Sequence, residues 1–186
     1  MSVKTTITIY KWAGKFGPFR IKIPCGECTL TTDIVNATVY HELGDIPIEV
    51  IEKNWLDHWY KPLLRGGWHA PMVLVDNKVI SQGVALNRGV LVEAVIAAHS
   101  SKTPITGNHM FGKDNCSFCR EAKTLLNQHN IDYEYHEVIE QPKALYEMLT
   151  RVKPIIHPKT PITTPQIWLN GQYIGGYDAL KKHLTD

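Results

Sequence analysis

All four cysteines of the chain lie in two C-x-x-C pairs, Cys25–Cys28 and Cys116–Cys119. Such a pair at the start of a helix suits thiol chemistry, because the first sulfur faces unpaired backbone N–H groups and the positive end of the helix dipole, which stabilise its thiolate. The second cysteine follows about one turn later and can attack a mixed disulfide formed by the first. The pattern predicts thiol–disulfide exchange, with Cys116 as the nucleophile, Cys119 as the resolving thiol, and Cys25 and Cys28 as a second candidate dithiol.

Metal binding is the alternative role for such pairs. Four cysteines in two pairs would suit a Cys₄ zinc site, but the two pairs are separated by far more than the roughly 15–20 residues of a zinc ribbon. The nine histidines form no H-E-x-x-H motif or other tight ligand spacing, so we interpret them as structural or surface residues. We therefore expect no metal ligands.

A cluster of turn-forming residues between Ser100 and Asn108 marks a break in the chain. It follows an apolar helical pattern that ends near His99. A chain of 186 residues can form two compact units of about 90 residues each. We predict two domains, one over residues 1–101 and one over residues 102–186.

Both halves show the order strand, helix, strand, helix, strand, strand, helix, which indicates an α/β fold. In the second half we expect strands near 110–111, at 131–139 and in a hairpin at Asn170-Gly171, and helices over 116–129, over 143–152 and from Asp178, with Asn115 as N-cap of the first. In the first half we expect strands over 6–11, 46–52, 72–75 and 78–81, helices over 32–43, 55–64 and 87–99, and a long loop over 13–24.

A proline precedes each predicted hairpin at the same distance. Pro71 lies five positions before the Asp76-Asn77 turn, and Pro165 lies five positions before Asn170-Gly171. A proline before a strand offers no N–H and restrains the backbone, so the preceding residue can present its backbone groups to an extended peptide. A cis bond between Thr164 and Pro165 would serve this purpose.

Three segments in the second half resemble a glutaredoxin of the dithiol, phage-type kind: Lys113–Cys119, Thr163–Ile167 and Gly175–Asp178. The resemblance covers about residues 105 to 186. It implies that glutathione lies across the proline edge, its cysteinyl part on the Thr164 backbone and its glycine carboxylate near Lys113. The implied cofactor-binding residues are Lys113, Phe118, Thr164, Pro165, Gly176, Tyr177 and Asp178, of which the last three hold the γ-glutamyl end.

The first half is similar to the thioredoxin superfamily around Pro24–Cys28 and Ala70-Pro71. Together the two resemblances imply two tandem thioredoxin-fold domains, each a central mixed sheet flanked by helices. Glu27 stands between the two thiols and its negative charge opposes thiolate formation there. We therefore expect Cys25 to be less reactive than Cys116.

The resemblance implies a glutathione-dependent thiol–disulfide oxidoreductase that reduces protein disulfides or glutathione mixed disulfides. The N-terminal dithiol domain would act as a relay or bind the client, and ribonucleotide reductase is a client by analogy, because the segment Val152–Ile162 is similar to phage-type members. Two alternatives stay open: an iron–sulfur cluster or metal carrier, and a redox-inactive adaptor fused to a reductase.

Charge and hydropathy restrict the partners. The net charge is +2, from 20 basic and 18 acidic residues, and no block of like charge stands out, so nucleic acid and membrane surfaces are not expected partners. The N-terminal residues alternate like a strand, and no apolar run approaches the roughly 18 residues of a membrane span. We expect a cytoplasmic location, where a reducing environment disfavours structural disulfides.

Overall fold

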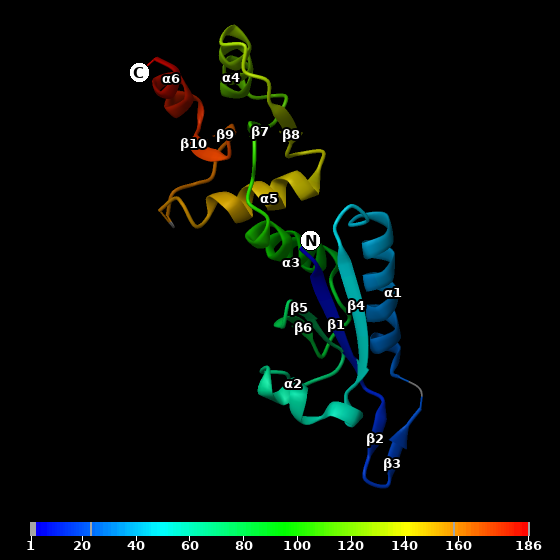
Figure 1. Cartoon of the computed structure of the whole chain (residues 1–186). Helices are drawn as coiled ribbons and strands as arrows, with labels where there is room; N and C mark the ends of the chain where they lie inside the picture. Colours follow the sequence, from blue (N-terminus) through cyan, green and yellow to red (C-terminus); the bar gives the residue numbers. More distant parts are fainter. Residues whose placement is uncertain (1–2, 23, 158, 186) are drawn as a thin grey trace. The chain divides into compact units, whose positions relative to one another are not determined.

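The computed structural model describes residues 3–22, 24–157 and 159–185. The chain forms two compact units, Met1–His99 and Ser100–Asp186, which we call the N-terminal unit and the C-terminal unit (Figure 1). Each unit contains its own mixed sheet with helices around it.

A four-stranded sheet in the order β4-β1-β5-β6 forms the centre of the N-terminal unit. Its long strands β1 and β4 run parallel, while β5 and β6 pair antiparallel (Figure 1). The elements up to the end of α3 are β1 (Thr5–Lys11), β2 (Gly14–Phe16), β3 (Phe19–Ile21), α1 (Gly26–His41), β4 (Ile48–Asn54), the 3₁₀ helix η1 (Leu56–His58), α2 (Tyr60–Leu64), β5 (Met72–Val75), β6 (Lys78–Gln82) and α3 (Arg88–Lys102).

The C-terminal unit repeats this topology with a sheet in the order β10-β9-β7-β8. Here β7 and β8 are parallel, and β9 pairs antiparallel with both β7 and β10. The elements are β7 (His109–Gly112), α4 (Ser117–Gln128), β8 (Glu134–Glu137), α5 (Pro142–Val152), β9 (Gln166–Leu169), β10 (Gln172–Gly175) and α6 (Tyr177–Thr185). The prediction of two α/β domains with mixed sheets of the thioredoxin-fold type is confirmed.

The sheet of the C-terminal unit carries a hydrophobic cluster on each face. Successive residues of a strand point to opposite faces, so Met110 and Phe111 of β7 enter different clusters. Met110 packs in one cluster with Cys116 and Cys119, whereas Phe111 packs in the other with Met148 of α5. The cysteine pair therefore lies on the face of the sheet that α4 covers, and α5 covers the opposite face.

Both predicted hairpin turns have the expected backbone. Asp76 and Asn77 have φ values of 47° and 72°, and Asn170 and Gly171 have 52° and 77°, as the two central residues of a type I′ turn require. The peptide bonds before Pro71 and Pro165 are both cis. Each unit thus presents a cis proline at the start of the strand that precedes its hairpin.

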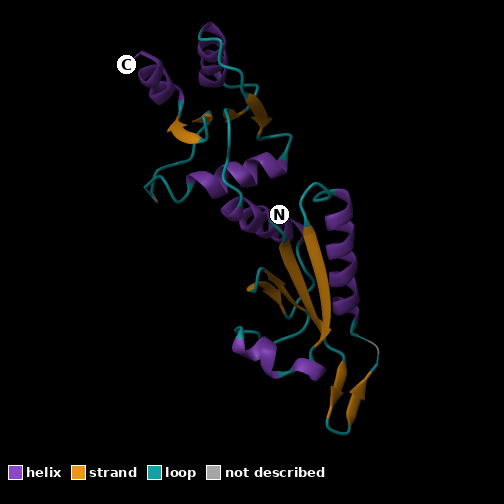
Figure 2. Ribbon diagram, in the orientation of Figure 1, coloured by secondary structure: helices purple, strands orange, loops and turns teal. Residues whose placement is uncertain are grey.

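The structure corrects several predicted elements. Residues 13–24 were expected to form a loop, but β2 and β3 pair there as a hairpin that extends beyond the sheet (Figure 2). Helix α1 starts at Gly26, not near residue 32, so it includes the C-x-x-C pair. The helical segment predicted over 55–64 divides into η1 and α2. Strand β8 is shorter than the predicted 131–139.

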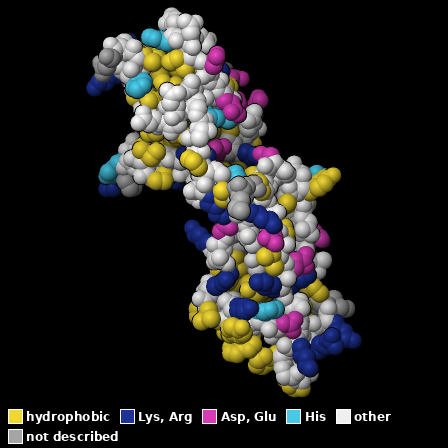
Figure 3. Space-filling view, viewed as in Figure 1, with side chains coloured by type: hydrophobic (Ala, Val, Ile, Leu, Met, Phe, Trp, Pro, Cys, Tyr) yellow, Lys and Arg dark blue, Asp and Glu magenta, His cyan; other side chains and the backbone are white. Residues whose placement is uncertain are grey.

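The tryptophans of the N-terminal unit differ in exposure. Trp55 is buried, but Trp59 and Trp68 are 47% and 76% exposed. Hydrophobic side chains gather at the end of the N-terminal unit that α2 and the β2–β3 hairpin form (Figure 3). Phe16 contacts Trp59 there in an edge-to-face arrangement with ring centroids 6.0 Å apart. In the described residues, no helix combines the length and the apolar character that crossing a bilayer needs.

Candidate active site

The first cysteine of the C-terminal pair caps the helix that follows it. Cys116 has extended backbone angles and its Sγ accepts a hydrogen bond from the backbone N–H of Cys119 at 3.2 Å. The N-cap is therefore the cysteine itself, and the prediction of Asn115 as N-cap was wrong by one residue. The reason is that a thiolate can take the acceptor role that Ser, Thr, Asp or Asn usually fills at this position.

The surroundings favour the thiolate at Cys116. Burial raises the pKa of this thiol. Hydrogen bonds from Cys119 and Thr164, together with the positive charge of Lys113, outweigh burial and hold the pKa below its ordinary value. Burial and the hydrogen bond to Cys116 raise the pKa of Cys119. The two sulfurs are thus differentiated: Cys116 is the more acidic thiol of the pair and Cys119 the less acidic one.

Thr164, the residue before the cis proline, contacts the same sulfur. The Cys116 thiol lies 3.7 Å from the carbonyl oxygen of Thr164, and the Thr164 hydroxyl lies 3.8 Å from the sulfur. Two segments that are distant in sequence, the start of α4 and the strand edge before β9, therefore meet at one atom.

A cavity of about 330 Å³ opens beside this contact. Its size falls in the range of roughly 300–1,000 Å³ that is usual for small-molecule sites. It is lined by Phe118, Thr163, Thr164, Pro165, Gly176, Tyr177, Asp178 and Ala179. The rings of Phe118 and Tyr177, two of these residues, have centroids 6.1 Å apart and are tilted by 35° relative to each other. Of the seven residues predicted to bind a cofactor, six line this cavity and Lys113 does not.

Tyr135 of β8 belongs to the surroundings of the pair, although the sequence analysis did not single it out. Gly112 leaves space for it, since a Cβ there would lie 3.1 Å from the Tyr135 ring and 3.3 Å from the sulfur of Cys119. Its hydroxyl donates to Asp114 at 3.4 Å, and the Lys123 ammonium lies 3.4 Å from its ring centroid. The strand alternation that places Tyr135 on the cysteine face is the only signal in the sequence.

The N-terminal pair has a different geometry. Cys25 is the exposed N-cap of α1 and makes no side-chain capping bond among the described residues. The two sulfurs lie 3.0 Å apart, and Cys28 accepts a hydrogen bond from the backbone N–H of Trp12. Burial raises the pKa of Cys28 to about 11. A cavity of about 470 Å³ in this unit is lined by the β2–β3 hairpin, Asn54 and Asp57, and neither cysteine lines it.

Three further polar residues meet in the C-terminal unit. His109 of β7 and Glu134 and His136 of β8 bring their side-chain donor atoms within 4.8 Å of one another. Sequence reasoning missed this group because the two histidines are far apart in the chain. The available signal was the alternation Glu134-x-His136 within the strand predicted over 131–139.

A dithiol at a helix N-terminus, with a lowered pKa at its first sulfur and a cis-proline strand against that sulfur, defines a thiol–disulfide oxidoreductase of the thioredoxin fold. Within that class, residues 109–174 match the family model described as Glutaredoxin, and the C-terminal unit is a glutaredoxin domain.

Known proteins similar to the chain are also glutaredoxins. The chain is 29% identical over 93 residues to Glutaredoxin-2 of Schizosaccharomyces pombe. The matched segment covers 50% of this chain and 77% of that protein. Among solved structures, the holo form of glutaredoxin C1 from Populus tremula x tremuloides is 23% identical, covering 52% of this chain and 89% of that one, with a TM-score of 0.38. The buckwheat glutaredoxin–glutathione complex is 19% identical, covering 52% and 83%, also with a TM-score of 0.38.

Proposed function

We propose that the chain is a glutathione-dependent reductase of protein disulfides and glutathione mixed disulfides, with Cys116 as its nucleophile. The observation that carries the proposal is the position of the Cys116 sulfur. It caps α4, it touches Thr164 before the cis proline, and Thr164 also lines the 330 Å³ cavity. A small thiol bound along that cavity would have its sulfur beside Cys116.

The charged groups of glutathione match the residues in and near the cavity. The N-terminus of α6 at Gly176, Tyr177 and Asp178 suits the γ-glutamyl carboxylate, because backbone N–H groups and the helix dipole favour an anion there, while the Asp178 side chain suits the α-ammonium group. The backbone of Thr164 would pair with the cysteinyl part, and the glycine carboxylate would lie near Lys113. The relative from buckwheat was solved with glutathione, which supports the choice of ligand.

The reaction consists of four thiol–disulfide exchanges: two reduce the client disulfide, and two use glutathione to restore the enzyme. The Cys116 thiolate attacks a client disulfide, forms a mixed disulfide and releases one client thiolate. Cys119 then attacks the Cys116 sulfur, loses its proton, and releases the second client thiol. One glutathione opens the resulting Cys116–Cys119 disulfide, and a second releases glutathione disulfide and restores both thiols. A glutathione mixed disulfide needs Cys116 and one further glutathione only.

For the N-terminal unit we propose a second dithiol centre that relays electrons or binds the client. Cys25 is exposed above the buried Cys28, and the cis bond before Pro71 repeats the arrangement of the C-terminal unit. An adaptor without redox activity is the competing role. We further propose a cytoplasmic location, since glutathione keeps thiols reduced there, and ribonucleotide reductase as a client to test first.

The deciding experiment is glutathione-coupled turnover of a small glutathione mixed disulfide and of a protein disulfide. The variants are Cys116→Ser, Cys119→Ser and Cys25→Ser, with wild type beside them. Loss of both activities in Cys116→Ser supports the assignment. Cys119→Ser should lose the protein disulfide activity and retain turnover of the mixed disulfide. A loss confined to the protein disulfide in Cys25→Ser would support the relay over the adaptor.

Full turnover by Cys116→Ser, or no turnover by wild type, would contradict the proposal. Purified protein with visible absorption that depends on Cys116 would favour the cluster carrier instead.

A further inference from the structure

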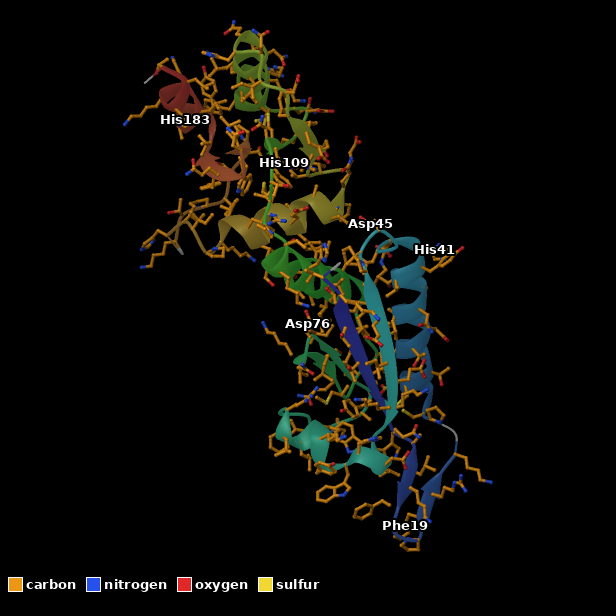
Figure 4. The ribbon with its side chains drawn as sticks, in the orientation of Figure 1. Phe19, His41, Asp45, Asp76, His109 and His183 are labelled. Atoms are coloured by element: carbon orange, nitrogen blue, oxygen red, sulfur yellow. The ribbon has the colours of Figure 1, made fainter. Side chains whose placement is uncertain are left out.

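The parallel pairing of β7 and β8 collects three potential metal ligands on one face of the sheet. His109 pairs with Glu134 in the register, and His136 lies two residues beyond Glu134, so all three side chains point the same way. Tyr135 between them points to the other face, where it packs against the cluster that contains the cysteine pair. Figure 4 labels His109 on β7, and the cysteine chemistry described above does not use this group.

The donor atoms converge at distances close to those of a coordination shell. His109 Nδ1 lies 3.0 Å from His136 Nε2 and 3.6 Å from a carboxylate oxygen of Glu134. His136 Nε2 lies 3.8 Å from the other Glu134 oxygen. A tetrahedral zinc ion with bonds of about 2.0–2.1 Å requires its ligand atoms to be roughly 3.3–3.4 Å apart. The observed distances lie on both sides of that value.

The protein already holds the first ligand in a metal-binding tautomer. His109 Nε2 lies 2.7 Å from the backbone carbonyl oxygen of Thr106, so this nitrogen carries the proton and donates it. Nδ1 is then left with a lone pair that faces His136 Nε2, 3.0 Å away. A second ring nitrogen that donates to a backbone carbonyl is the usual support of a metal-bound histidine.

Stacking fixes the second ligand. The His136 ring stacks on that of Phe111, with centroids 4.5 Å apart, and meets the nearly coplanar His109 ring at its edge, with centroids 5.3 Å apart. Both interplanar angles are below 20°, at 19° and 12°. Rings held in this way lose little freedom when an ion binds, which favours binding. Glu134 is 67% exposed at its side chain and leaves the outer side of the group open to solvent.

We propose that His109 Nδ1, His136 Nε2 and the Glu134 carboxylate bind one divalent transition-metal ion of the zinc class. Two imidazoles and a carboxylate are a donor set that zinc and cobalt accept, and three protein ligands leave a fourth position for water. The ion would link β7 to β8 on the face of the sheet opposite to the dithiol. Without a metal ion, the group is a hydrogen bond between the two histidines with the exposed Glu134 carboxylate beside them.

The test is a cobalt titration of the full chain carrying Cys25→Ser, Cys28→Ser, Cys116→Ser and Cys119→Ser, since free cysteines would bind the same ion. Tetrahedral Co²⁺ with nitrogen and oxygen ligands gives visible d–d bands, and no sulfur-to-metal charge-transfer band should accompany them. Glu134→Gln and His109→Ala should weaken binding by more than about 100-fold, beyond the 10- to 100-fold effects of outer ligand partners. His183→Ala, at an exposed histidine of α6, is the matched control and should bind like wild type.

Zinc then identifies the ligand atoms. In Zn²⁺-loaded protein, long-range ¹H–¹⁵N spectra should show His109 coordinated through Nδ1 with Nε2 protonated, and His136 coordinated through Nε2. Because Glu134 is exposed, its glutamine variant should remain folded and keep its mixed-disulfide turnover, which separates lost metal binding from lost structure. Absence of saturable Co²⁺ bands in wild type, or equal bands in Glu134→Gln and His109→Ala, would overturn the proposal.

Discussion

Thr164 contacts the sulfur of Cys116 through its hydroxyl as well as through its carbonyl oxygen. The hydroxyl hydrogen bond lowers the pKa of the thiol, so its removal should raise that pKa. We expect Thr164→Val, which keeps the side-chain shape, to slow alkylation of Cys116 at neutral pH by roughly two- to fivefold. The rate of iodoacetamide labelling, followed by mass spectrometry, measures this.

Thr124→Val is the matched control for that substitution. Thr124 is exposed on α4 and its hydroxyl bonds only the carbonyl of Arg120 among the described contacts. Its loss should leave the labelling rate of Cys116 unchanged. An unaltered rate in Thr164→Val would mean that the hydroxyl does not stabilise the thiolate.

Three of the four thiols should differ in the pH at which they react. A lowered pKa means that the thiolate of Cys116 is present at lower pH than that of an ordinary thiol, so its labelling rate should rise first. The thiols of Cys119 and Cys28 have raised pKa values, about 11 for Cys28, and both are buried. We expect them to resist labelling of the folded protein until the pH is well above 9. Labelling of Cys119 in the same pH range as Cys116 would contradict the assigned roles.

The hairpin between β9 and β10 depends on a glycine that other residues cannot replace. Gly171 has a φ of 77°, and a Cβ there would lie 2.8 Å from the carbonyl oxygen of Ile105. We expect Gly171→Ala to destabilise the C-terminal unit by about 2–4 kcal/mol, from the left-handed backbone and the displaced neighbouring chain. Denaturant unfolding monitored by tryptophan fluorescence measures the loss.

Gly107→Ala separates the two causes. Gly107 has a φ of 83°, but a Cβ there would meet only a His109 ring nitrogen at 3.9 Å, an ordinary contact. The free energy of unfolding of this variant should fall only by what the left-handed backbone costs an alanine, about 1 kcal/mol. Equal losses in the two variants would show that the contact with Ile105 contributes nothing.

Elements with strong local signals were predictable from the sequence. Both type I′ hairpins follow from Asp-Asn and Asn-Gly turns between apolar runs, and α5 follows from its regular apolar spacing. Helix α1 was predicted too short for a physical reason. Its buried positions are Cys28, Thr31, Val35 and Thr38, so half of its buried face is threonine and the apolar period is hidden. The buried Thr31 is tolerated because its hydroxyl accepts a hydrogen bond from the backbone N–H of Leu86.

The candidate site was predictable where backbone motifs define it and not where tertiary packing does. The cysteines, Thr164 and the α6 N-terminus belong to local motifs, and the structure brings six of the seven predicted cofactor-binding residues around one cavity. The grouping of His109 with Glu134 and His136 depends on the register of two strands distant in sequence. Local pattern does not determine such a register, so the group became visible only in the fold.

The two units of the chain have the same topology, and the differences between them indicate which unit turns over a small mixed disulfide. Each unit has its own mixed sheet, its own dithiol at a helix start and its own cis proline. The C-terminal unit contains the cavity beside the pair with the lowered pKa, while the N-terminal cavity is lined by neither of its cysteines. Turnover of a small mixed disulfide should therefore need the C-terminal unit alone.

Expression of residues 103–186 tests this division, because the cut leaves α3 intact on the other piece and keeps the Thr103 carbonyl that Arg151 binds. We expect this piece to fold and to turn over a glutathione mixed disulfide within about threefold of the full chain in kcat/KM, because that reaction uses Cys116 and the adjoining cavity only. Reduction of a protein disulfide should fall further if the N-terminal dithiol relays electrons or binds the client. A folded but inactive piece beside an active full chain would show that the N-terminal unit completes the active site, and equal activity on both substrates would make that unit dispensable for reduction.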